Sequence, residues 1–138
     1  MLRRLLSYIP VFALSVITTI AILYLTLAPQ PLPDVEIPMF EGIDKVVHFL
    51  MMYGLTGIIA FDCLRLKHYS RQIKAPLNLV VAITVGTIAF GVLIEIMQLH
   101  MDAGRSFDPS DIIADTLGSL AAAATIIPLW PSVSSWYH

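Results

Sequence analysis

The chain has 138 residues, of which 57% are hydrophobic and only 13% are charged. About a quarter of the residues in a typical soluble domain are charged, so this composition excludes a soluble globular protein and indicates an integral membrane protein of one domain, 1–138. The net charge of -2 and the lack of a basic stripe with interleaved aromatics exclude a nucleic-acid-binding protein, and the single cysteine, Cys63, excludes an internal disulfide.

Four apolar blocks each have about the 17 to 25 residues that cross a bilayer as a helix: 5–27, 44–64, 77–99 and 111–130. The first block follows two arginines, as a signal peptide does, but it is longer than a signal core of about 7 to 15 residues. We therefore expect it to be a retained span. The prolines at 29, 31, 33 and 38 then predict an extended loop before the second block.

Backbone groups in lipid must pair within their own segment or within a closed barrel, and the period-two alternation of a barrel is absent here. The predicted fold is thus all-α, a membrane bundle of four transmembrane helices. Asp108, Pro109 and Ser110 predict the start of the last helix, with acidic residues at its positive end. Gly118 and Ser119 in that helix are small enough to allow close contact with a neighbouring helix.

The distribution of basic residues predicts the orientation of the bundle. Of the eight lysines and arginines, six precede the first span or lie between the second and third spans: Arg3, Arg4, Arg65, Lys67, Arg71 and Lys74. The positive-inside rule therefore places both termini and the middle loop in the cytoplasm, as in a multi-pass protein of the cytoplasmic membrane. The ends of the spans near 44, 99 and 111 then face outward.

Polar side chains recur at these expected outer ends, and helical spacing of three and four residues puts those of each helix on one face: Asp44, Lys45 and His48; Glu95 and Gln98; Asp108, Asp111 and Asp115. At a rise of about 1.5 Å per residue, His48, Glu95 and Asp115 all lie about 6 to 7 Å inside the ends of their spans. An ionisable residue within a span costs about 2.5 to 3.5 kcal/mol on insertion scales, so several at one level predict a functional site.

The predicted site has more negative than positive charge. Five carboxylates face only two cations, Lys45 and Arg105, and like charges at close range cannot all stay ionised. Protonation of one or two acids would suit general acid/base chemistry beside His48. Alternatively, His48, Glu95 and Asp111 could hold a divalent metal with an open position for water, although no familiar metal-binding spacing supports this, or a cationic ligand could balance the charge. The set could also be structural, as helix caps and a buried pair.

These residues carry a family resemblance. The pattern Asp44-Lys45-x-x-His48-Phe49 with Tyr53, then Glu95-x-x-Gln98, then Arg105, Asp108, Asp111 and Gly118 resembles the VanZ-like family, named for a teicoplanin-resistance protein. The resemblance runs from about residue 23 to residue 124. It implies a small multi-pass protein of the bacterial cytoplasmic (inner) membrane with a role in the cell envelope, and in some members lowered susceptibility to teicoplanin. Asp115 departs from the pattern, which usually has Asn at this position.

We expect an outward-facing pocket at the outer leaflet that binds or modifies a lipid-linked or peptidoglycan-related molecule. In the enzymatic version Glu95 or Asp111 is the general acid or base, and His48 shuttles a proton. The predicted substrate-binding residues are Asp44, Lys45, Tyr53, Gln98, Arg105, Asp108 and Asp115, with Lys45 and Arg105 holding a phosphate or carboxylate. Two alternatives are a non-catalytic binding or scaffold protein and a small transporter. The sequence does not indicate a cofactor or an oligomeric state.

Overall fold

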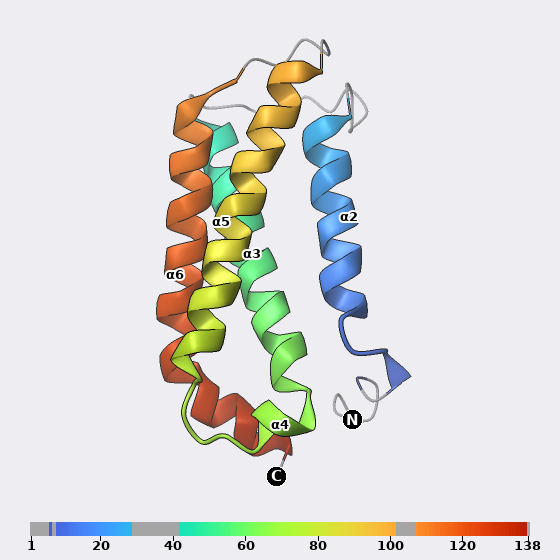
Figure 1. The fold of residues 1–138 in the computed structure, drawn as a ribbon, viewed down its shortest axis with the longest axis vertical. Helices are drawn as coiled ribbons and strands as arrows, with labels where there is room; N and C mark the ends of the chain where they lie inside the picture. Colours follow the sequence, from blue (N-terminus) through green and yellow to red (C-terminus); the bar gives the residue numbers. More distant parts are fainter. Residues whose placement is uncertain (1–5, 7, 29–41, 102–106, 138) are drawn as a thin grey trace.

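The computed structural model describes residues 6, 8–28, 42–101 and 107–137, apart from the side chains of residues 67, 68 and 137. Every regular element in these residues is helical, and four helices run along the long axis of the molecule (Figure 1): α2 Ala13–Leu27, α3 Ile43–Leu64, α5 Leu77–His100 and α6 Pro109–Ser134. A short helix α4, Lys67–Ser70, lies between α3 and α5, and a 3-10 turn η1, Ser135–Tyr137, follows α6. The prediction of an all-α four-helix bundle is confirmed.

The helices α3, α5 and α6 are long and apolar enough to cross a membrane, with 22, 24 and 26 residues. At about 1.5 Å per residue even the shortest of them reaches about 33 Å, against about 30 Å for the hydrocarbon core of a bilayer. Each helix also presents large apolar side chains on the outside of the bundle, among them Leu50, Val85, Leu93 and Leu117. This is the surface that membrane-spanning helices turn toward lipid.

The first helix differs from the expected span 5–27, because α2 begins only at Ala13 and has 15 residues. The residue before it, Phe12, has a left-handed backbone with φ 70, and Pro10 supplies no backbone N–H. These two residues interrupt the helix within the apolar block. At about 1.5 Å per residue α2 reaches about 22 Å, which is shorter than the hydrocarbon core.

A buried polar cluster fixes the start of α2 against the end of α3. The Asp62 carboxylate accepts hydrogen bonds from the backbone and hydroxyl of Ser15 at 3.0 and 2.7 Å, and it pairs with Arg65 at 3.0 Å. Arg65 also donates to the carbonyl oxygens of Leu6 and Ile9. This cluster lies at the end of the bundle where α2 begins and α6 ends, opposite the end where α3 and α6 begin (Figure 1).

The packing of α3 on α6 is the most extensive helix contact in the bundle. It depends on Gly118, because a Cβ atom at this position would lie 2.3 Å from the backbone oxygen of Phe49. Deeper in the bundle, the Thr87 hydroxyl lies 2.9 Å from that of Thr56 and 3.0 Å from that of Ser119, which links α3, α5 and α6. Close contact at small residues and hydroxyl pairs are the usual ways of joining helices in lipid.

Candidate functional site

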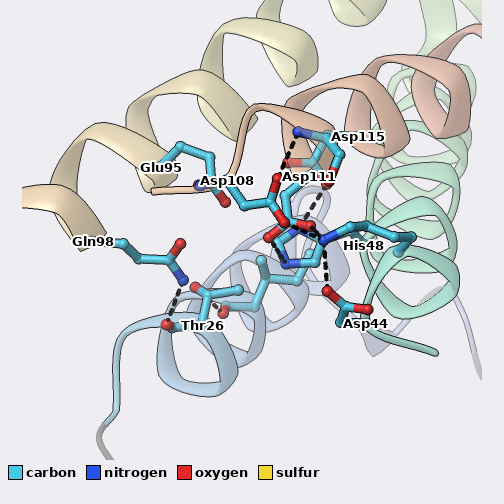
Figure 2. Close-up of polar contacts among 11 residues, drawn as sticks. Thr26, Asp44, His48, Glu95, Gln98, Asp108, Asp111 and Asp115 are labelled. Atoms are coloured by element: carbon cyan, nitrogen blue, oxygen red, sulfur yellow. Dashed lines mark hydrogen bonds and ion pairs between the residues drawn. The ribbon is translucent and has the colours of Figure 1, made fainter. Parts of the chain in front are cut away.

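The polar side chains predicted on one face each of α3, α5 and α6 meet at one end of the bundle. The first turns of α3 and α6 and the last two turns of α5 lie together at the top of Figure 1, and Figure 2 shows the side chains that they bring together. We call Asp44, Lys45, His48, Glu95, Asp108, Asp111 and Asp115 the ionic cluster. All seven were predicted from the sequence, so helical spacing correctly identified the faces that converge.

Lys45 is the positive centre of the outer part of the ionic cluster. Its ammonium lies 2.6 Å from Asp44, 2.6 Å from Asp108 and 2.5 Å from Asp111. A lysine ammonium has three N–H donors, so each can serve one of these carboxylates. Lys45 therefore joins the start of α3 to the start of α6, and it has no donor left for another anion unless a carboxylate is displaced.

Asp108 caps the start of α6. One of its oxygens accepts hydrogen bonds from the backbone and the hydroxyl of Ser110, at 2.9 and 2.6 Å, and the other faces Lys45. The Lys45 ammonium, followed by the Ser110 hydroxyl and backbone donors, holds the pKa of the Asp108 carboxyl well below its ordinary value. Asp108 thus stays ionised at the position where the helix N-terminus also favours negative charge.

His48 occupies the next level of the ionic cluster and lies between two aspartates of α6. Its Nδ1 is 3.1 Å from Asp115, and its Nε2 is 3.5 Å from Asp111. When Nδ1 carries the ring proton, this contact is a hydrogen bond that His48 donates to the Asp115 carboxylate. This contact fixes the ring, with Nε2 directed toward Asp111.

Glu95 comes from α5 and is fully buried, at 0% exposure. One carboxylate oxygen accepts a long hydrogen bond of 3.3 Å from the backbone N–H of Asp108. Its other oxygen, Oε1, has no hydrogen-bond partner among the described residues, and neither has Oδ2 of Asp115. More than about 90% of buried polar groups in proteins are paired, so these two oxygens need an explanation.

Solvent exposure decreases across the ionic cluster from its outer to its inner members. Side-chain exposure falls from 57% at Asp44 through 30% at Lys45 to 12% at Asp111 and 1% at Asp115. A polar path therefore leads from the border of the bundle inward to Asp115, along the seam between α3 and α6, and Glu95 of α5 is buried beside it. Water or a polar headgroup can approach the outer members, whereas the inner ones are enclosed by the helices.

Two predicted residues, Gln98 and Tyr53, do not join the ionic cluster, and a third is not among the described residues. Gln98 points to α2 instead, where its amide donates to the carbonyl oxygen of Thr26 at 2.8 Å (Figure 2). The Tyr53 hydroxyl lies 3.1 Å from that of Thr125 and so makes a contact between α3 and α6, beside an apolar cavity that the ring lines with Ala60, Ala122 and Trp130. Arg105 lies outside the described residues.

Sequence reasoning missed Gly91. A Cβ atom at this position would lie 2.7 Å from Oδ2 of Asp115, so only glycine leaves room for that carboxylate beside α5. A signal existed, because Gly91 lies four residues before Glu95 and therefore on the same face of the helix. A glycine inside a helix also costs about 1 kcal/mol relative to alanine, which usually indicates a packing reason.

Two groups of side chains in the ionic cluster are spaced closely enough to hold a metal ion. In the first, one ligand atom each from His48, Glu95 and Asp111 lie within 4.8 Å of one another. The second consists of Asp44, Asp108 and Asp111, the three carboxylates that already surround the Lys45 ammonium. The arrangement can thus support acid/base chemistry or metal binding at its inner level, and ion pairing at its outer level.

The comparisons with known proteins give one finding. A protein-family model described as VanZ/LLP1 matches residues 7–130, a range that includes every residue of the ionic cluster. The comparison with curated proteins and the comparison with solved structures gave no match.

Proposed function

The chain belongs to the VanZ/LLP1 family, and on this premise we propose that its ionic cluster binds, and chemically modifies, the polar head of a cell-envelope component. We place the protein in the cytoplasmic membrane of a bacterium with the ionic cluster at the outer leaflet. The ligand class is a lipid-linked or peptidoglycan-related molecule whose polar head reaches the border of the bilayer.

One observation carries this proposal: ionisable side chains from three separate helices meet at one end of the bundle, and they range from exposed Asp44 to buried Asp115 and Glu95. A purely structural ion pair does not need the inner acids. Burying them without full hydrogen bonding costs about 1 to 3 kcal/mol for each unpaired group, and more when the group is charged. A functional requirement for Glu95 and Asp115 explains why this cost is retained.

In the proposed chemistry the inner residues act on the ligand and the outer residues fix the geometry. Glu95 or Asp111 serves as the general acid or base, and His48 moves a proton between Asp111 and Asp115, which lie on its two sides. Lys45 positions α6 through Asp108 and Asp111. We therefore assign Lys45 to ordering the site, in place of the direct phosphate contact that the sequence suggested.

The Glu95→Gln variant tests the enzymatic form of the proposal, because it keeps the shape of the side chain and removes its acid/base function. We expect the envelope lipid profile of a strain carrying Glu95→Gln to differ from the parent in the amount of one component. Thr116→Val is the matched control, since the Thr116 hydroxyl donates within its own helix to the carbonyl oxygen of Ile112, 2.7 Å away. An unchanged profile in Glu95→Gln, with the protein inserted normally, would contradict catalysis.

Orientation is tested by labelling single cysteines in a Cys63→Ala background with a membrane-impermeant maleimide. Met101 and Ile73 lie at opposite ends of α5 and are both exposed, at 38% and 75%. We expect the Met101→Cys variant to label in intact spheroplasts and the Ile73→Cys variant only after lysis. The reverse pattern would put the ionic cluster in the cytoplasm and end the proposal of an envelope ligand.

The family resemblance extends the proposal to teicoplanin. We expect expression of the chain to lower susceptibility to teicoplanin and Glu95→Gln to abolish the effect. Minimum inhibitory concentrations in a susceptible host, with Thr116→Val as the control, measure this directly. If Glu95→Gln lowers teicoplanin susceptibility as much as the parent chain does, the resistance does not depend on acid/base chemistry at Glu95.

A non-catalytic binding protein is the second candidate, because Lys45 and His48 already have carboxylate partners at 2.5 to 3.1 Å. A site that only binds needs this preorganisation and no proton transfer. Asp111→Asn separates the two candidates. A graded loss of ligand binding with an unchanged lipid profile favours the binding protein, whereas complete loss of a lipid product favours the enzyme.

A further inference from the structure

We infer that His48, Glu95 and Asp111 form a binding site for one divalent transition-metal ion, of the class of Zn²⁺ or Mn²⁺. One ligand atom from each of the three side chains lies within 4.8 Å of the other two. Ligand atoms at about 2.1 Å from a common ion in tetrahedral geometry are about 3.4 Å apart, so the widest pair needs to close by up to about 1.4 Å.

The buried Glu95 carboxylate is the strongest indication of an ion. It is fully buried, and its Oε1 has no hydrogen-bond partner among the described residues. The nearest described charges include Asp111 and Asp115, which are also acidic, whereas the Lys45 ammonium is already occupied by three other contacts. A cation between Glu95, His48 and Asp111 would satisfy the free oxygen and balance the excess of carboxylates.

His48 is oriented as a metal ligand is. Metal-binding histidines almost always donate their second ring N–H to a carboxylate or carbonyl, which fixes the ring and the tautomer. Asp115 provides this partner at Nδ1, 3.1 Å away, so Nε2 is the nitrogen that faces Asp111, at 3.5 Å. Nε2 and a carboxylate oxygen are both acceptors, and they face one another favourably only with a proton or a cation between them.

The ligand set selects the class of ion. Imidazole favours Zn²⁺ and other transition metals, and carboxylates favour harder ions such as Mn²⁺ and Mg²⁺. One nitrogen and two carboxylates suit Zn²⁺ or Mn²⁺, with at least one coordination position open. The second acidic group, Asp44, Asp108 and Asp111, is a weaker candidate because the Lys45 ammonium already lies at its centre.

The inference concerns the same site as the proposed function and rests on it only for the role of the ion. With an ion bound, His48, Glu95 and Asp111 would act as its ligands, and water in the open position would supply the acid/base chemistry in their place. The ionic cluster has excess negative charge and no free donor on Lys45, so by itself it repels a phosphate. A bound ion with an open position would offset part of this negative charge and offer a phosphate-bearing headgroup a direct coordination position. The ligand of the site is thus a headgroup that carries phosphate or pyrophosphate and binds through the metal ion.

The test is metal binding by the purified full chain in detergent micelles, after removal of metal by a chelator. Titration with Zn²⁺ against a chromogenic chelator should show one ion per chain, and Co²⁺ should give the visible absorption of a site with nitrogen and oxygen ligands. Asp115→Ala should weaken Zn²⁺ binding by about ten- to a hundredfold, the usual loss when the partner behind a ligating histidine is removed. Glu95→Gln should weaken it at least as much.

Asp44→Asn distinguishes the two acidic groups. Asp44 is an exposed member of the group around Lys45 and does not belong to the proposed ligand set, so we expect its loss to change Zn²⁺ affinity by no more than about threefold. A larger loss in Asp44→Asn than in Glu95→Gln would overturn the assignment. Absence of Zn²⁺ and Co²⁺ binding by a chain whose circular dichroism shows intact helices would also overturn it.

Added inorganic pyrophosphate tests the role of the ion. It should shift the absorption of the Co²⁺-loaded chain, because it enters the open position, and an unchanged spectrum would refute the phosphate-bearing ligand class. None of these measurements uses an envelope lipid. If the parent chain binds metal but the Glu95→Gln strain keeps the parent lipid profile, the proposed function alone is overturned. If the Glu95→Gln strain has a changed lipid profile but the parent chain binds no metal, the inference alone is overturned.

Discussion

Gly118→Ala tests the packing that brings α6 onto α3. A Cβ atom on residue 118 would lie 2.3 Å from the backbone oxygen of Phe49, and 3.0 and 3.1 Å from its carbonyl carbon and Cα. All three atoms belong to the backbone, so no side-chain rotation relieves the contact. Ordinary van der Waals contact begins at 3.4 Å. The two helices would have to separate by about 1.1 Å.

Overpacking of this kind costs about 1 to 3 kcal/mol, and a backbone contact falls at the upper end of that range. Alanine also gains about 1 kcal/mol over glycine in a helix. The Gly54→Ala variant of α3 is the control, because a Cβ atom there would meet nothing within 4 Å. The control receives the gain alone, so we expect Gly118→Ala to be less stable than Gly54→Ala by about 3 kcal/mol.

The assay is unfolding by SDS titration in detergent micelles, followed through the fluorescence of Trp130, which is 2% exposed. Separation of α3 from α6 should also loosen the contacts of Lys45 and His48 with α6. We therefore expect Gly118→Ala to lose both stability and site function. Equal midpoints for Gly118→Ala and Gly54→Ala would refute the close helix contact on which the description of the site depends.

Three further variants test single contacts with the same assay. Gly91→Ala should displace Asp115, lower stability by about 1 to 3 kcal/mol and abolish site function, whereas Gly86→Ala, with nothing within 4 Å of its added Cβ, should be neutral or stabilising. Lys45→Met leaves three carboxylates without their ammonium and should cost about 1 to 3 kcal/mol, between the values for exposed and buried ion pairs, so an unchanged midpoint would contradict the described pairing. Thr87→Val removes the hydroxyl shared by α3 and α6 and should cost about 0.6 to 1.7 kcal/mol, and a stabilised variant would contradict that role.

The fold was predictable because lipid leaves a chain few choices. Apolar blocks of sufficient length must be helical, so the expected blocks 44–64 and 77–99 correspond closely to α3 Ile43–Leu64 and α5 Leu77–His100. The ends of the other two helices were less predictable. Phe12 interrupts the first block through its backbone conformation, and α6 continues through Pro128 and Pro131 to Ser134, beyond the expected end at 130.

The sequence predicted which polar residues share a face of each helix, but it did not predict which neighbouring helix each side chain contacts. Spacing by three and four residues correctly grouped Lys45 with His48 and Asp111 with Asp115. The same rule placed Gln98 with Glu95. Gln98 instead contacts α2, because one side of α5 packs against two different helices, α2 and α6. Which helix receives a given side chain depends on crossing geometry, and a single sequence does not contain that information directly.

The charge balance divides the ionic cluster into two parts with different roles. At the outer part, one ammonium contacts three aspartates, and Asp44 and Asp108 are partly open to solvent, so each carboxylate has a cationic partner without any ligand. At the inner part, Glu95 and Asp115 each keep an oxygen without a partner, and His48 is the only basic group described there. Substitutions of the outer part should therefore act mainly on the stability of the bundle, whereas substitutions of the inner part should act mainly on binding. Because a neutral amide cannot become a buried, uncompensated charge, Glu95→Gln is expected to be at least as stable as the parent while losing function.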